Sequence, residues 1–115
     1  MKAKRVVMCG LVAMAAGTAS VAAQQPADAA ALYARQCAAC HGATGAPNPA
    51  MVRSLGTIPD FTDARLMAAQ PDSVLEAAIA GGKGRNMPAY RSRLSAAQIR
   101  ALVTYVKALS RRPVR

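Results

Sequence analysis

Residues 37–41 of this 115-residue chain read Cys-Ala-Ala-Cys-His. The C-x-x-C-H pattern is the attachment signature of a c-type haem. Two thiols three positions apart lie close together on one helical turn, so they can add to the two vinyl groups of a haem and hold it by thioether bonds. The next residue, His41, is then aimed at the iron and supplies one axial nitrogen. The stretch therefore predicts one covalent haem c on Cys37 and Cys40, with His41 as an iron ligand.

Two other kinds of site use the same cysteine pair. Zinc is bound by four ligands, commonly Cys and His, but the chain has three Cys and one His, and Cys9 lies in a segment that we expect to be removed. A thioredoxin-like dithiol occurs near a βαβ pattern, and the sequence has no β-rich run. Haem attachment is favoured, and the dithiol and metal sites are the alternatives.

The N-terminal segment has the three parts of a secretory signal peptide. A basic stretch at residues 2–5 precedes an uncharged run, residues 6–23, which ends in Ser-Val-Ala-Ala before Gln24. A membrane anchor needs about 20 strongly apolar residues, whereas this run is mostly Ala and includes Gly, Ser and Thr. We therefore expect residues 1–23 to be a cleaved signal peptide. Residues 24–115 then form one exported, periplasmic domain without a transmembrane helix of its own.

The first half of this domain alternates between helical and loop patterns. Asp28 is an acceptable N-cap, and residues 29–40 predict a helix that Gly42 stops directly after the Cys-His motif. Residues 42–60 carry several Gly and Pro and predict a loop. Residues 61–69 predict a short helix.

The second half predicts two further helices. Pro71-Asp72-Ser73 suits the start of a helix that ends at Gly81-Gly82. The last helix begins after a capping box of Ser95 and Gln98. It then carries one apolar stripe of five residues: Ile99, Leu102, Val103, Val106 and Leu109. The domain is therefore predicted to be all-α.

A second axial ligand must come from another residue type, because His41 is the single His of the chain. Met sulfur is the natural candidate, and the mature chain holds Met51, Met67 and Met87. Met87 follows a Gly-rich stretch, whose backbone can run close to a flat cofactor, and precedes Pro88, which stiffens the chain. Met51 and Met67 are better explained as core filling, so Met87 is favoured.

These motifs together resemble a class I cytochrome c, of the small single-haem bacterial type. The Cys-His motif, the sequence Met-Pro-Ala-Tyr at residues 87–90 and the last helix all match that pattern across residues 28–109. The resemblance implies a cytochrome c-like fold of about four short helices wrapped around the haem. It also implies His41 and Met87 as axial ligands, packing of the first helix against the last, and a carbonyl of Pro47 or Pro49 that orients His41.

A His/Met ligand pair raises the reduction potential and leaves no open position on the iron. The sequence therefore predicts an electron carrier between respiratory or dehydrogenase partners, and not an enzyme. A haem-based ligand sensor, and an electron-acceptor subunit of a dehydrogenase complex, are the alternatives. A peroxidase-like site would need an open face and a distal acid or base, typically His.

The mature chain is strongly basic, with twelve Lys and Arg against five Asp and Glu. Four of these cations flank Met87: Lys83, Arg85, Arg91 and Arg93. They predict redox protein partners with an acidic docking surface, including docking to a membrane respiratory complex. An ordinary solvated face is the alternative. No nucleic-acid-binding motif accompanies the charge.

Overall fold

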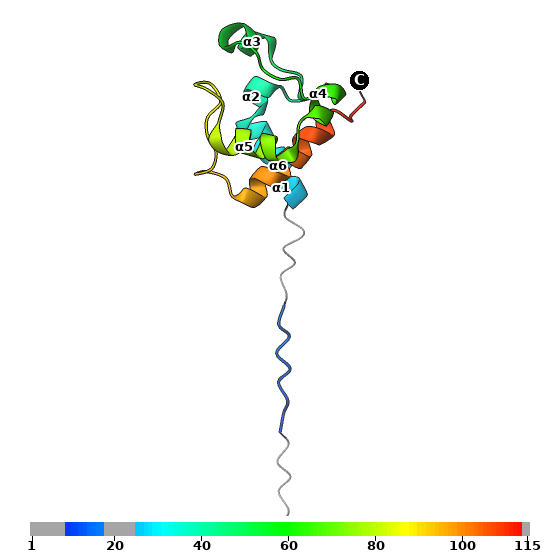
Figure 1. The fold of residues 1–115 in the computed structure, drawn as a ribbon. Coiled ribbons are helices and arrows are strands. Elements are labelled where there is room, and N and C mark those ends of the chain that lie inside the picture. Colours follow the sequence, from blue (N-terminus) through cyan, green and yellow to red (C-terminus); the bar gives the residue numbers. More distant parts are fainter. Residues whose placement is uncertain (1–8, 18–24, 114–115) are drawn as a thin grey trace, which may run out of the picture.

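The computed structural model describes residues 9–17 and 25–113. These residues form six helices (Figure 1): α1 (Gln25–Gln36), α2 (Ala38–His41), α3 (Pro49–Leu55), α4 (Ala64–Ala69), α5 (Asp72–Gly81) and α6 (Ala96–Leu109). The described residues contain no β-strand, and an isolated antiparallel bridge joins Lys83 to Met87. The prediction of an all-α domain is confirmed, with six helices instead of about four.

The predicted first helix is divided into α1 and α2. The helix already includes Gln25, so the predicted start after Asp28 is wrong. Cys37 interrupts the helix with φ −122° and ψ −38°. Gly42 ends α2, as predicted, with a φ of 79°. The break places Cys37 at a bend between two helical segments, directly beside the cavity described below.

The prediction of a loop over residues 42–60 is wrong, because α3 lies within it. The Asn48 side chain accepts a hydrogen bond from the Ala50 amide at 3.0 Å, and Pro49 occupies the first helical position. Proline is favoured at that position, where its missing N–H costs nothing. Pro49 therefore starts a helix at a place where the Pro and Gly content indicated a loop.

The helix predicted from residue 61 begins later, at Ala64. The Asp63 carboxylate accepts hydrogen bonds from the amides of Arg65 and Leu66 at 2.9 and 3.1 Å, which makes Asp63 the N-cap. Phe61 precedes this cap and is buried in the core. The start of α4 is thus set by its capping residue.

The last two helices agree closely with the sequence. In α6 the Ser95 hydroxyl accepts from the Gln98 amide at 3.1 Å, while the Gln98 side chain accepts from the Ser95 amide at 2.8 Å. This is the predicted capping box. The predicted stripe of α6 is buried in full: Ile99, Leu102, Val103, Val106 and Leu109.

Helix α6 is the centre of the packing. It contacts both α1 and α5, so the predicted packing of the first helix against the last is confirmed. Tyr33 of α1 and Leu102 and Leu109 of α6 are each 1% exposed. None of the helices in the described residues has the length and hydropathy needed to cross a membrane.

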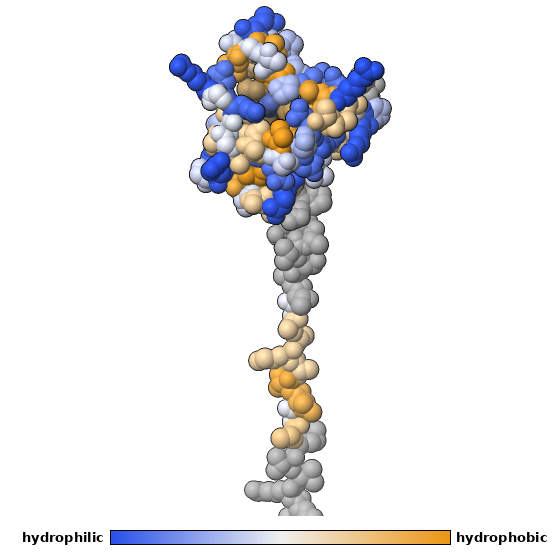
Figure 2. All heavy atoms as spheres, in the orientation of Figure 1, coloured by the Kyte–Doolittle hydropathy of each residue, from blue (hydrophilic) through white to orange (hydrophobic). Residues whose placement is uncertain are grey.

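The predicted cleavage site after Ala23 lies outside the described residues. Residues 9–17 have no regular secondary structure, and all of them are exposed. Figure 2 shows this segment as mainly apolar, and its large hydrophobic side chains, Leu11, Val12 and Met14, are exposed. The helical domain has apolar patches between hydrophilic groups on the same view.

Candidate functional site

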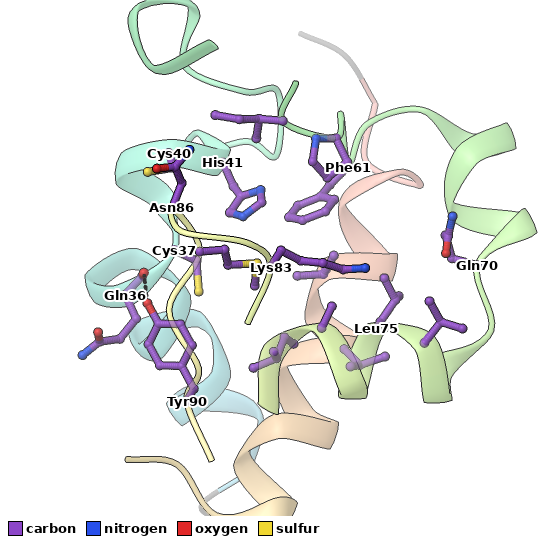
Figure 3. A pocket seen from close by; sticks show the side chains of 18 of the residues that line it. Gln36, Cys37, Cys40, His41, Phe61, Gln70, Leu75, Lys83, Asn86 and Tyr90 are labelled. Atoms are coloured by element: carbon purple, nitrogen blue, oxygen red, sulfur yellow. Dashed lines mark hydrogen bonds between the residues drawn. The ribbon is translucent and has the colours of Figure 1, made fainter. Parts of the chain in front are cut away.

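A cavity of about 510 Å³ lies inside the helical domain. Its walls come from the Cys-His turn, from α4, α5 and α6, from residues 55–61 and from residues 83–90 (Figure 3). Most of its lining is apolar, including Leu75, Ile79, Val103 and Val106. The volume lies within the range of small-molecule and cofactor sites, roughly 300–1,000 Å³.

Cys37 and Cys40 line this cavity as free thiols. Burial raises the pKa of the Cys37 thiol to about 11. A reactive dithiol needs the opposite shift, because the thiolate is the nucleophile and is favoured by a lowered pKa. The environment of Cys37 therefore disfavours the dithiol interpretation and is compatible with permanent covalent attachment.

His41 lines the same wall, and its ring stacks on Phe61 (Figure 3) with centroids 4.6 Å apart and an interplanar angle of 14°. Burial lowers the pKa of the imidazole. The ring is therefore held in the neutral form, which is the form that binds metal. No sequence pattern predicted Phe61 at this site, although it is the only Phe of the chain.

The Nδ1 atom of His41 is buried and has no hydrogen-bond partner. The structure therefore lacks the expected hydrogen bond from His41 to the carbonyl of Pro47 or Pro49. Stacking on Phe61 orients the ring instead. A buried ring nitrogen without a partner is uncommon in folded proteins, so His41 is distinguished by this feature from the other side chains of the cavity wall.

The structure separates the three candidate methionines. Met87 and Met67 both line the cavity, whereas Met51 does not. Met67 is 3% exposed and belongs to the core cluster around Tyr33 and Leu102. Met87 is half-buried in the loop that follows α5. Its neighbours in the chain, Asn86 and Pro88, also line the cavity.

The Met87 loop, residues 82–90, is closed at its base by two backbone hydrogen bonds. The Lys83 amide donates to the Met87 carbonyl at 2.9 Å, and the Met87 amide donates to the Lys83 carbonyl at 3.2 Å. Gly82 precedes this closure with a φ of 74°. A Cβ atom on Gly82 would lie 2.5 Å from the Met87 carbonyl oxygen. Glycine is therefore required here for close approach of one backbone segment to another.

Tyr90 is a further cavity residue that sequence reasoning missed. Its ring is buried, and its hydroxyl donates a hydrogen bond to the Gln36 carbonyl at 3.0 Å (Figure 3). The available signal was its position three residues after Met87, in a chain with only three Tyr.

The donor set fits a haem better than a zinc ion. In the described residues, no three or more His, Cys, Asp or Glu side chains are grouped to hold a metal ion. The cavity instead combines two thiols, one neutral imidazole, Met sulfur and a largely apolar wall. These are the groups that attach, ligate and enclose a c-type haem.

The comparisons with known proteins agree with this arrangement. The profile of the family described as "Cytochrome C oxidase, cbb3-type, subunit III" matches residues 24–106. A solved structure, the KustC0563 c-type cytochrome, superposes with a TM-score of 0.64 at 28% identity, covering 70% of this chain and 95% of that chain. No curated protein gives a significant match. The chain therefore belongs to the cbb3-type cytochrome c oxidase subunit III family, and it is a small c-type cytochrome with an all-α cytochrome c-like fold and covalently attached haem c.

Proposed function

We propose that this cytochrome is an electron carrier whose single haem is attached through Cys37 and Cys40 and ligated by His41 and Met87. Haem-based electron transfer follows from the family. The finer assignment is best supported by the cavity, because the Cys-His turn and the Met87 loop both line it. These two segments are far apart in the sequence. One carries the Cys-x-x-Cys-His motif, and the other carries the Met-Pro motif.

The proposed ligands have the chemistry that electron transfer needs. When bound, the haem supplies an iron that gains and loses one electron, and a His/Met pair favours a raised potential. With His41 and Met87 both holding it, the iron would have no position open to an external substrate. The Met87 loop and the apolar wall limit water at the site, so little rearrangement accompanies the change of charge.

The assignment of Met87 is tested by replacing each methionine with Leu, which keeps the volume and removes the sulfur. Each variant is exported in a host that attaches haem, reduced, and exposed to carbon monoxide. We expect Met87→Leu to bind carbon monoxide and to have a lower reduction potential. We expect Met51→Leu and Met67→Leu to keep the low-spin spectrum of the unchanged protein.

Met67→Leu is the decisive control, because Met67 also lines the cavity. If Met67→Leu binds carbon monoxide while Met87→Leu does not, the sulfur ligand is Met67. If the unchanged protein already binds carbon monoxide readily, the iron has an open or labile face, and the haem-based sensor replaces the carrier as the function.

The proposed partners are redox proteins with an acidic docking surface. Lys83, Arg85, Arg91 and Arg93 are all exposed on or next to the Met87 loop. The ion pair found in residues 25–113 joins Lys107 to Asp72, so these four charges are not neutralised by described side chains. The family's description names subunit III of a cbb3-type cytochrome c oxidase. Docking to a membrane respiratory complex is therefore part of the proposal, and an acceptor subunit of a dehydrogenase complex is the alternative.

The proposed location is the periplasm, after removal of residues 1–23. Covalent haem attachment through a Cys-x-x-Cys-His motif and the three-part N-terminal segment both support export. The family match begins at residue 24, where we expect the mature chain to begin. N-terminal sequencing of the haem-containing protein tests this: a first residue near Gln24 is expected, and retention of Met1 would contradict cleavage.

A further inference from the structure

The Met87 loop is tied to the rest of the domain by side chains on both sides of Met87. On one side, Asn86 Nδ2 donates to the Leu55 carbonyl at the end of α3, at 3.3 Å. On the other side, the Tyr90 hydroxyl donates to the Gln36 carbonyl at the end of α1, at 3.0 Å. These two bonds join residues that are 31 and 54 positions apart in the chain. They therefore fix the loop against two different elements.

The two ties differ in strength because their surroundings differ. The Asn86 bond is exposed and long, so water competes with it. Tyr90 is 7% exposed, and its amide also donates to the Ile79 carbonyl of α5 at 3.0 Å. The Tyr90 hydroxyl bond is part-buried, and losing a hydrogen-bond partner costs more there than at the exposed surface. Tyr90 is therefore the stronger of the two ties.

The acceptor of the Tyr90 bond lies at the haem-attachment turn. Gln36 is the last residue of α1 and directly precedes Cys37. The carbonyls of a last helical turn lack partners within the helix, so the hydroxyl of Tyr90 satisfies one of them. The bond connects the segment that carries Met87 with the segment that carries Cys37, Cys40 and His41. Burial also raises the pKa of the Tyr90 phenol, so the hydroxyl stays a donor at neutral pH.

We propose that Tyr90 is a positioning residue that holds Met87 against the iron by tying its loop to the end of α1. The inference rests on the proposed ligation by Met87. Tyr90 acts here through the backbone of the loop, since its hydroxyl is bonded to Gln36. Without that bond, the loop opens more often and the sulfur leaves the iron more often, while His41 and the thioether bonds are untouched.

The test compares Tyr90→Phe with Tyr105→Phe in the haem-containing protein. Both changes remove one hydroxyl and keep the ring. Tyr105 packs on Tyr33, with ring centroids 5.1 Å apart, and does not line the cavity. The probe is imidazole, whose binding to the oxidised iron requires the sulfur to leave first. Since a hydrogen bond contributes about 0.5–1.5 kcal/mol, we expect imidazole to bind about 2- to 10-fold faster in Tyr90→Phe. We expect no change in Tyr105→Phe.

A second measurement separates positioning from general stability. Hydrogen exchange at the Met87 amide, which is bonded to the Lys83 carbonyl, should accelerate in Tyr90→Phe by a factor similar to that of imidazole binding. Exchange of the slowest amides of α6 should change less. If both sets of amides accelerate equally, the effect is global destabilisation and the positioning role is wrong.

The two proposals fail in different ways. If the unchanged protein shows the sulfur-to-iron charge-transfer band and Tyr90→Phe binds imidazole at the unchanged rate, the role of Tyr90 is wrong and ligation by Met87 stands. If the band is absent from the unchanged protein and Met87→Leu leaves imidazole binding unaltered, ligation by Met87 is wrong, and the role of Tyr90 falls with it.

Discussion

At the scale of single residues, burial sets the protonation of the side chains at the cavity. It raises the pKa of the Cys37 thiol to about 11 and lowers that of the His41 imidazole. Both shifts favour neutral groups, as expected where an apolar environment penalises charge. The same site therefore favours a protonated thiol and an unprotonated imidazole at neutral pH, and the unprotonated imidazole is the form that binds metal.

Tyr33 gives a prediction for the dependence of stability on pH. Burial raises the pKa of its phenol, with smaller contributions from Cys37 and Tyr105, and its hydroxyl donates to the Gly42 carbonyl at 2.7 Å. The folded-state pKa is above the unfolded value of about 10. The unfolded state therefore releases its proton first, and the contribution of Tyr33 to the free energy of unfolding is lost as pH rises above about 10.

The measurement is the free energy of unfolding of the unchanged protein and of Tyr33→Phe, at about pH 8 and about pH 11. The unchanged protein should be the more stable at the lower pH, and the difference between the two proteins should shrink at the higher pH. Burial also raises the pKa of Tyr90, which remains in Tyr33→Phe. The variant should therefore still lose some stability at high pH, but less than the unchanged protein. Equal losses in both proteins would show that Tyr33 does not titrate in this way.

Gly82 and Gly84 form a matched pair for testing the Met87 loop. Both have positive φ, 74° and 55°, but a Cβ atom on Gly84 meets nothing within 4 Å. Gly84→Ala should cost only the backbone strain of about 1–2 kcal/mol. Gly82→Ala adds a collision with the Met87 carbonyl, so we expect a further loss of about 1–3 kcal/mol.

The readouts are the free energy of unfolding and the sulfur-to-iron charge-transfer band. Gly82→Ala should weaken the band, because the collision displaces the segment that carries the sulfur. Gly84→Ala should keep it. An unchanged band in Gly82→Ala would mean that the close approach of Gly82 to Met87 is not needed for ligation.

At the scale of elements, the sequence predicted best the helix whose signals are all local. In α6 the signals are the capping box and the apolar stripe, and the helix begins directly after Ser95 and buries that stripe, as predicted. Helix α3 was missed because the same Pro49 that suggests a loop also suits a helix start. In the structure, the hydrogen bond from the Ala50 amide to the Asn48 side chain caps the helix that Pro49 begins.

In the candidate site, too, the sequence predicted the residues that belong to short motifs and missed those that depend on contacts between distant segments. Cys37, Cys40 and His41 belong to one short motif, and Met87 to another, so both could be read from the sequence. Phe61 and Tyr90 act through contacts between distant segments, which no local pattern encodes. Their partners are His41 and Gln36 respectively.

The capping box of α6 gives a prediction at this scale. Ser95→Ala removes the acceptor for the Gln98 amide and should lower the free energy of unfolding by about 1 kcal/mol. Ser95→Asp keeps an accepting oxygen at the same position and should lose much less. Chemical denaturation of the haem-containing variants measures both, and equal losses would indicate that the cap does not stabilise α6.

At the scale of the whole molecule, the charge is unevenly distributed along the chain. No acidic residue follows Glu76, while Lys83, Arg85, Arg91 and Arg93 surround the Met87 loop. Like charges gathered near a site attract oppositely charged partners and accelerate encounter more than they tighten binding. The basic surface is therefore expected to affect the rate of electron transfer more than the affinity for a partner.

Oxidation of the reduced protein by hexacyanoferrate(III), a small anion, measures this steering. The rate should fall as salt rises, because the screening length is about 10 Å at 0.1 M salt. Arg91→Gln should lower both the rate and its salt dependence. Arg100→Gln, an exposed change on the solvent side of α6, should have a smaller effect. A rate that is independent of salt would indicate an ordinary solvated surface.

The electron-carrier proposal requires one covalent haem with both axial positions filled by the protein. The most direct measurement is the redox difference spectrum of the exported, unmodified protein, followed by exposure of its reduced form to carbon monoxide. We expect a low-spin c-type spectrum that carbon monoxide does not change. Rapid binding of carbon monoxide would contradict ligation by both His41 and Met87, and the absence of any haem from a host able to attach it would contradict the role of Cys37 and Cys40.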